Sequence, residues 1–174
     1  MCCRCPGATR SSSSAPPRPA RRGSRLNVVL VEPEIPQNTG SIARLCAATD
    51  TPLHLVGKLG FSLDDRYLKR AGLDYWPLVK LRVHASWSDF LTAVSPPRLI
   101  ALSAQGSESY TRVTYAADDS LVFGGETCGL PETLRAELAP LYRIPMAGRG
   151  VRSLNLANAV SIVLYEALRQ LGTV

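Results

Sequence analysis

The chain has 174 residues, enough for one domain with its own core, and its 45% hydrophobic and 20% charged residues are typical of globular proteins. No apolar run approaches the roughly 18 residues that a membrane span needs. The formal net charge of +6 comes from the first 25 residues, because removing their six arginines from the 20 Lys and Arg leaves 14 bases against 14 acids. The net charge of the rest of the chain therefore does not indicate nucleic-acid binding. A binding surface on residues 26–174 would need a local cluster of positively charged side chains.

Residues 1–25 are rich in Ser, Pro and Arg and show no apolar periodicity, so they are predicted to form a disordered basic tail. The remaining residues, 26–174, are predicted to form one domain. The tail has no apolar stretch that would suit a secretory signal. A transit peptide, a misread upstream start codon and a basic arm that helps to hold RNA all stay open.

The five cysteines show neither zinc-site spacing nor a disulfide framework, since Cys2, Cys3 and Cys5 crowd the start while Cys46 and Cys128 stand alone. A reducing cytoplasm is therefore the expected compartment. No metal site is indicated.

The first half of the domain is predicted to alternate strand and helix. Leu26–Val31 is an apolar run of strand length, as expected for a buried parallel strand. A loop with two prolines and the Asn38-Thr39-Gly40 step follows, and a helix is predicted over Ser41–Thr49, with Arg44 projecting from its first turns. Leu53–Val56 is a second short strand, and a helical segment is expected over Leu63–Arg70.

The second half continues the alternation, with a helix over Ala85–Val94 and a long helix after Asn155. Strands are predicted at Leu78–Val83, Arg98–Leu102, Ser120–Phe123 and Leu141–Ile144. This order predicts an α/β fold, a mostly parallel sheet with helices on both faces. The last helix has a core face with Leu156 and Val160, and a mixed face with Tyr165 that suits a ligand site or a subunit contact.

Three loops that follow strands have the composition of ligand-binding loops: Leu102–Gly106, Gly124–Pro131 and Pro145–Ser153. Ligands of such sheets bind beyond the carboxyl ends of the strands, so these loops could meet in space. The chain has no G-x-G-x-x-G after its first strand and no phosphate-binding P-loop motif. A standard Rossmann nucleotide site and a P-loop are therefore disfavoured.

Individual polar residues allow two interpretations each. Glu126 could anchor a ligand or cap a nearby helix, and Arg44 could bind phosphate or simply be an exposed helix residue. Asn155 could orient a reacting group or act as a helix N-cap. His54 and His84 are expected to be structural, and Trp76 and Trp87 to be core residues. The pairs Asp64-Asp65 and Asp118-Asp119 are expected to be solvated loop charges.

Three sequence blocks together resemble the motifs of the SpoU branch of the SPOUT methyltransferases. They are NTGSIAR at Asn38–Arg44, FGGETCGLP at Phe123–Pro131, and RIPM at Arg143–Met146 with RSLNLANAV at Arg152–Val160. Finer features resemble the members that methylate the ribose 2′-hydroxyl of the wobble nucleotide, cytidine or uridine 34 of tRNA. These features are Val29–Asn38, Arg70–Trp76 and Tyr165–Gly172.

The resemblance implies a C-terminal trefoil knot, S-adenosylmethionine as cofactor, tRNA (its anticodon region) as substrate, and a homodimer with the site at or near its interface. It implies no membrane and no metal. The implied cofactor contacts are Leu102, Gly124, Ile144, Pro145, Met146, Ser153 and Leu154. The implied catalytic residues are Asn38, Arg44, Glu126, Ser153 and Asn155, with Tyr165 and Arg152 at the substrate or the dimer contact.

Within this resemblance, Arg44 is either a general base or an electrostatic stabiliser. Two departures stand out, since many relatives have Pro in place of Gly125 and Arg in place of Cys128. RNA contacts are expected from the local positive charges of Arg44, Lys69-Arg70, Arg149 and Arg152, and from the N-terminal arm. The alternatives are a SpoU-type 2′-O-methyltransferase for another tRNA or rRNA position, and a catalytically inactive RNA-binding protein.

Overall fold

The computed structural model describes residues 26–63, 75–148 and 150–174. The predicted tail over residues 1–25, Asp64-Asp65, Lys69-Arg70, Arg149 and nearly all of the helix expected over Leu63–Arg70 lie outside the described residues.

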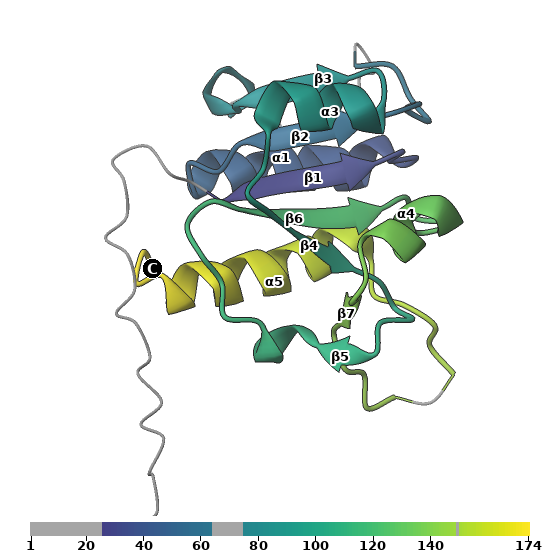
Figure 1. The fold of residues 1–174 in the computed structure, drawn as a ribbon. Coiled ribbons are helices and arrows are strands. Elements are labelled where there is room, and N and C mark those ends of the chain that lie inside the picture. Colours follow the sequence, from purple (N-terminus) through teal and green to yellow (C-terminus); the bar gives the residue numbers. More distant parts are fainter. Residues whose placement is uncertain (1–25, 64–74, 149) are drawn as a thin grey trace, which may run out of the picture.

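A seven-stranded sheet forms the centre of the described chain, and its strand order is β3-β2-β1-β6-β4-β7-β5 (Figure 1). Every pairing between neighbouring strands is parallel, so their carboxyl ends lie along one edge. The strands are β1 (Asn27–Val31), β2 (Leu53–Val56), β3 (Leu81–His84), β4 (Arg98–Leu102), β5 (Glu108–Ser109), β6 (Asp119–Gly124) and β7 (Tyr142–Arg143).

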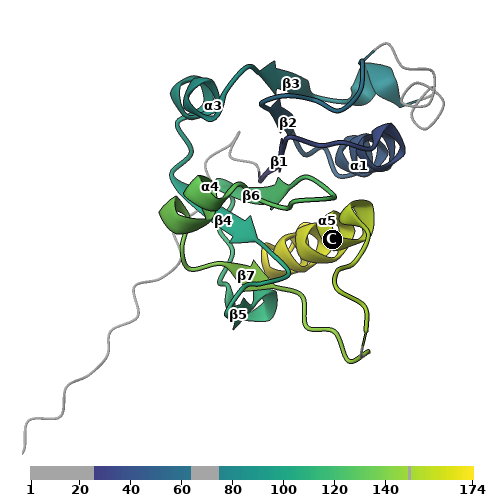
Figure 2. The ribbon, with the colours of Figure 1, turned by 90° about the vertical axis from the view of Figure 1, so that its right-hand side faces the viewer.

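Helices cover both faces of this sheet, as Figure 2 shows. Helices α1 (Pro36–Ala48) and α5 (Leu156–Gln170) lie on one face, and α3 (Trp87–Val94) and α4 (Glu132–Glu137) lie on the other. Two 3₁₀ turns, η1 (Trp76–Leu78) and η2 (Tyr110–Arg112), lie in the connections. The predicted α/β class and the helices on both faces are confirmed.

The central strands are apolar throughout because both of their faces are buried. In β1, Val28 and Leu30 belong to the core under α1 and α5, while Val29 and Val31 belong to the core on the side of α3 and α4. All four side chains are at most 3% exposed. This two-sided burial explains why a parallel strand shows a continuous apolar run instead of an alternating pattern.

The first helix begins earlier than its sequence indicates. Helix α1 starts at Pro36 and includes Asn38, Thr39 and Gly40, which were predicted to lie in a loop before a helix at Ser41. Proline suits the first helical positions because its missing N–H would be unpaired there anyway. The prolines therefore mark the start of the helix, and Asn38 becomes a buried residue of its first turn.

Other element boundaries also differ from the prediction. The strand expected over Leu78–Val83 is confined to Leu81–His84, because Trp76–Leu78 forms the turn η1. The elements β5 and η2 were not predicted, and α4 was considered only as a helix that Glu126 could cap. Each of the three is only two to six residues long. Elements of this length are too short to show a clear hydrophobic period.

Asp119 is a correction to the sequence analysis, which placed it in a solvated loop. It lies in β6 with a side chain 2% exposed and forms an ion pair with Arg98. The Arg98 Nε donates to its Oδ1 at 2.7 Å, and the backbone N–H of Ala116 donates to its Oδ2 at 2.7 Å. Asp119 thus joins β4, β6 and the turn between them.

The two histidines have the structural environment that was expected. The Nδ1 of His54 lies 3.0 Å from the Nε2 of His84, and both rings contact Phe90 edge-on. Burial, His84 and Arg82 together lower the pKa of His54 from 6.5 to about 4. The pair is therefore neutral at pH 7 and part of the core.

Among the described residues, no helix has the length and apolar character needed to cross a membrane.

Candidate active site

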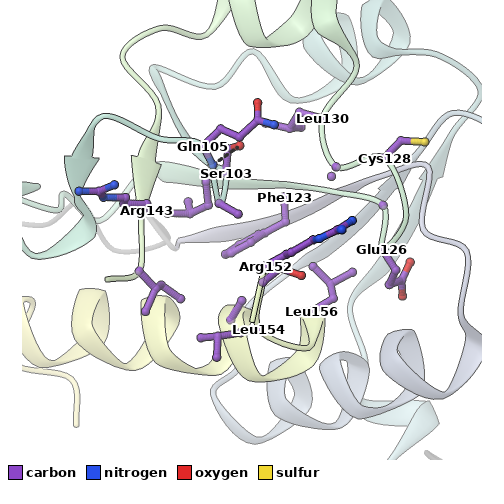
Figure 3. A pocket seen from close by; sticks show the side chains of 18 of the residues that line it. Ser103, Gln105, Phe123, Glu126, Cys128, Leu130, Arg143, Arg152, Leu154 and Leu156 are labelled. Atoms are coloured by element: carbon purple, nitrogen blue, oxygen red, sulfur yellow. Dashed lines mark hydrogen bonds between the residues drawn. The ribbon is translucent and has the colours of Figure 1, made fainter. Parts of the chain in front are cut away.

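A pocket of about 540 Å³ opens at the carboxyl edge of the sheet, where the loops after β1, β4, β6 and β7 converge on the start of α5. The three loops singled out from the sequence meet here, as predicted, because β6 pairs directly with β4, and β4 with β7. In Figure 3, Arg152 lies across the middle of the pocket between Phe123 and Leu156. Glu126 and Cys128 lie on one side, while Ser103 and Gln105 lie at the other end.

Most of the predicted site residues line this pocket, and three do not. Those in the lining are Asn38, Leu102, Gly124, Glu126, Ile144, Met146, Arg152, Ser153, Leu154 and Asn155. Pro145 is exposed in the loop after β7, and Arg44 is exposed on α1. Tyr165, on α5, is 47% exposed.

A chain of hydrogen bonds links the polar residues from the three motifs. The Asn38 Nδ2 donates to the Glu126 Oε1 at 2.8 Å, and the Asn155 Nδ2 donates to the Asn38 Oδ1 at 2.8 Å. The Asn155 Oδ1 in turn accepts from the backbone N–H groups of Ala157 and Asn158 at 2.9 and 3.4 Å. Every amide orientation in this chain is fixed by its neighbour, which makes the arrangement rigid before any ligand arrives.

Asn155 is a helix N-cap, one of the two roles that its sequence position allowed. Its side chain caps the N-terminus of α5, and the same side chain donates to Asn38. Glu126 does not cap α4, whose N-cap is Pro131 without a side-chain hydrogen bond. Instead the Glu126 Oε2 accepts from the backbone N–H of Glu34 at 2.8 Å, so this carboxylate binds the loop after β1.

Glu34 is a residue that the sequence analysis missed as part of the site. Its Oε1 accepts from the backbone N–H of Thr127 at 3.3 Å, and its Oε2 accepts from the Thr127 hydroxyl. Glu34 and Glu126 therefore hold each other's loops reciprocally. The sequence signal that could have identified Glu34 is an acidic residue in the loop after the first strand.

The glycines after β6 allow this loop to fold tightly back on itself. A Cβ at Gly124 would lie 2.0 Å from the carbonyl carbon of Gly129, and a Cβ at Gly125 would lie 2.5 Å from the carbonyl oxygen of Glu32. Gly125 and Gly129 form an isolated bridge. Position 125 is thus closely packed against the loop after β1 in this chain.

The far end of the pocket contains polar residues that sequence reasoning did not identify. The Arg135 Nη1 donates to the Gln105 Oε1 at 2.7 Å, while the buried Arg135 Nε has no partner. Arg143 also lines the pocket, so its described charged residues are one acid, Glu126, and three arginines, counting Arg152. This balance favours a ligand with an anionic group.

The residues present fit S-adenosylmethionine. The volume lies within the range of about 300–1,000 Å³ of small-molecule pockets. Leu102, Phe123 and Leu156 supply apolar walls for an adenine ring, and the unpaired Arg135 Nε and the Arg143 guanidinium can serve a carboxylate. Among the described residues, no group of three or more His, Cys, Asp or Glu side chains could hold a metal ion.

Known proteins are similar to this chain in sequence and in fold. The model of the SpoU rRNA Methylase family matches residues 25–165. The tRNA (cytidine(34)-2′-O)-methyltransferase of Escherichia coli (strain K12) is 49% identical over 149 residues, which cover 84% of this chain and 94% of that protein.

Two solved structures extend the comparison. One, described as giving structural insights into the 2-OH methylation of C/U34 on tRNA, has a TM-score of 0.81 and 50% identity, covering 86% of this chain and 97% of its own. The SpoU methyltransferase AviRb from Streptomyces viridochromogenes, in complex with the cofactor AdoMet, has a TM-score of 0.75 and 28% identity, covering 90% and 64%. The family match spans most of the chain and the relative is 49% identical over 84% of it, so the chain belongs to the SpoU methylase family.

Proposed function

We propose that this protein transfers a methyl group from S-adenosylmethionine to the ribose 2′-hydroxyl of the wobble nucleotide, cytidine or uridine 34, of tRNA. The observation that carries the proposal is the hydrogen-bonded chain Glu126–Asn38–Asn155, which joins the three family motifs at one pocket. Relatives named for this reaction match nearly their full length. The substrate position is taken from these relatives.

S-adenosylmethionine would supply the methyl group on a sulfonium, which is already a strong electrophile. The protein must then align a ribose hydroxyl and stabilise the negative charge that builds on its oxygen. Asn38, Ser153 and Asn155 lie in the pocket lining, where the fixed amides of Asn38 and Asn155 hold the loops in place. We assign to Ser153, whose side chain is exposed, contact with the hydroxyl or the loop.

Arg44 is the proposed cation for the reacting oxygen or its neighbouring phosphate. A guanidinium has a pKa of about 12.5–13.8, so removing its proton to create a base is costly at neutral pH. Electrostatic stabilisation, with the hydroxyl proton passing to phosphate or water, is the easier route. Arg44→Ala should therefore lower kcat by several orders of magnitude, and near-normal turnover of this variant would remove Arg44 from the site.

We further propose a homodimer with the site at or beside its interface. Arg44 and Tyr165 lie outside the pocket lining of a single chain, and exposed apolar side chains lead from the pocket rim onto α5. They are Met146, Val151, Leu154, Ile162 and Tyr165. Ile162→Asp should yield a monomer by sedimentation equilibrium with little methyl transfer, and a fully active monomer would contradict the proposal.

The trefoil knot of the family is assigned to the C-terminal segment from β7 to α5. Its support is the convergence of residues 102–105, 124–130 and 152–156 on one pocket. The cytoplasm, where tRNA is found, is the proposed compartment.

The test is methyl transfer from radiolabelled S-adenosylmethionine to total tRNA from a strain lacking this gene, followed by mapping of the labelled nucleotide. We expect label on the 2′-oxygen of nucleotide 34. Label at another tRNA position would contradict the proposed substrate nucleotide and would keep the reaction class. If the protein neither transfers a methyl group nor binds S-adenosylmethionine, the proposed enzymatic function is refuted. The alternative of a catalytically inactive RNA-binding protein would then be favoured.

A further inference from the structure

Arg44 contacts the aromatic residue Tyr75 in two ways. Its guanidinium carbon lies 4.6 Å from the centre of the Tyr75 ring, and its Nη2 donates to the Tyr75 hydroxyl at 3.3 Å. Tyr75 immediately precedes η1, which packs against α1, the helix that carries Arg44. The partners are 31 residues apart in sequence and are joined by tertiary structure.

Tyr75 is anchored well enough to hold another side chain. It is the N-cap of η1, and the next residue, Trp76, packs against the core under α1. Pro77, within the same turn, restricts the backbone further. Tyr75 remains 37% exposed, so it lies at the surface, where its ring meets the Arg44 guanidinium.

The chemistry of this contact suits an arginine that acts on an anion. Within the described part of the chain, Arg44 forms no ion pair with a carboxylate. An aromatic face and a neutral hydroxyl orient a guanidinium without neutralising its charge. The remaining N–H groups of Arg44 stay available to a phosphate or to a developing oxyanion.

We propose that Tyr75 is a positioning residue for Arg44, holding its guanidinium in one orientation for the reacting nucleotide. This inference rests on the proposed function, in which Arg44 stabilises the reacting 2′-oxygen or its phosphate. It does not require Tyr75 to touch the cofactor. A positioned cation lowers the transition-state barrier more than the same cation sampling many rotamers, so the effect belongs mainly to kcat.

The test compares Tyr75→Leu, which removes both contacts, with Tyr75→Phe, which keeps the ring and removes the hydroxyl. We expect Tyr75→Leu to lower kcat about tenfold or more, with KM for S-adenosylmethionine unchanged, and Tyr75→Phe to recover most of the loss. Leu78→Ala, at an exposed position of η1, is the matched control and should retain wild-type kcat. Thermal unfolding of each variant reports whether η1 stays folded.

A double-mutant cycle with Arg44→Ala separates positioning from an independent effect. If Tyr75 acts through Arg44, adding Tyr75→Leu to Arg44→Ala should change kcat less than twofold. An equal tenfold loss in both backgrounds would overturn the proposal, and so would normal kcat in Tyr75→Leu. If Arg44→Ala itself keeps normal turnover, the catalytic role of Arg44 fails first, and the positioning role of Tyr75 fails with it.

Motion of the Arg44 side chain gives a readout independent of catalysis. In the free protein, ¹⁵N relaxation of the Arg44 Nε should show restricted motion in the wild type and faster motion in Tyr75→Leu. Identical relaxation in the two proteins would contradict positioning even if kcat falls.

Discussion

Asn38 and Glu126 are 88 residues apart in sequence, yet the Asn38 Nδ2 donates to the Glu126 Oε1 at 2.8 Å beside the pocket. The other carboxylate oxygen of Glu126 accepts from the backbone of Glu34, so one side chain fixes both a motif residue and the loop before it. This pair ties the carboxyl ends of β1 and β6 together. Glu126 thereby holds together two segments beside the pocket.

Glu126→Gln should weaken this connection. A carboxylate accepts at both oxygens, whereas the glutamine NH₂ would face either the Asn38 amide or the Glu34 N–H without accepting. We expect the free energy of unfolding to fall by about 1–2 kcal/mol and kcat to fall with it. Urea titration and methyl-transfer kinetics measure the two effects, and Glu132→Gln at an exposed position of α4 is the control. Unchanged stability and turnover would show that the two loops do not need Glu126.

Gly124→Ala should impair cofactor binding. The new Cβ would meet the carbonyl carbon of Gly129 at 2.0 Å and the backbone nitrogen of Leu130 at 2.1 Å, so the loop that lines the pocket must move. Because overpacking costs about 1–3 kcal/mol, we expect roughly tenfold weaker binding or more in isothermal titration with S-adenosylmethionine. Gly148→Ala, whose Cβ has open space, should bind normally. Normal binding by Gly124→Ala would refute this role for the loop.

Asp119→Asn tests the ion pair that the sequence analysis overlooked. The substitution leaves the Arg98 guanidinium without its carboxylate partner at a position where the Asp119 side chain is 2% exposed. Arg98 is 44% exposed, so solvent moderates the loss, and we expect about 2 kcal/mol less stability. The neighbouring Asp118 is exposed, so Asp118→Asn should change the free energy of unfolding by less than about 0.5 kcal/mol. Equal urea midpoints for both variants would contradict the structural role of Asp119.

The buried histidine pair predicts a pH-dependent stability. The pKa of His54 is lowered by burial and by the charges of His84 and Arg82, and the pKa of His84 is lowered by burial and Arg82 against the opposing charge of Asp89. Since the unfolded chain binds protons more readily, the contribution is fully present above about pH 6.5 and is lost as pH falls towards 4.

The loss from this pair should be on the order of 2 kcal/mol across that window. Urea titrations at pH 7 and pH 5 measure it, with a His54→Leu, His84→Leu double variant as reference. The wild type should lose more stability than the reference as the pH falls. Parallel pH profiles would mean that folding does not lower the pKa values of the two histidines, against the expectation.

The order of the long elements could be predicted because their signals are local. The buried strands are apolar runs, and the last helix keeps its core residues at helical spacing. The start of α1 was missed because Pro36 and the Asn38-Thr39-Gly40 step also suit a loop, and only tertiary packing decides between the two. Asp119 was misjudged for the same reason, since its partner Arg98 lies on a neighbouring strand.

The part of the pocket that the sequence motifs form could be predicted. Leu102, Gly124 and Ser153 were assigned through the resemblance, and all three line the pocket. Glu34 and Arg135 lie outside the three motif blocks, and their roles depend on contacts 93 and 30 residues away along the chain. Such contacts leave no periodic or compositional trace in one sequence.

The most direct test of the central claim uses two tRNA substrates that differ by one oxygen atom. One has a ribose at nucleotide 34, and the other has a 2′-deoxyribose at that nucleotide alone. With radiolabelled S-adenosylmethionine, we predict methyl transfer to the first and none to the second, although both should bind the protein. Equal labelling of the two substrates would contradict methylation of this hydroxyl.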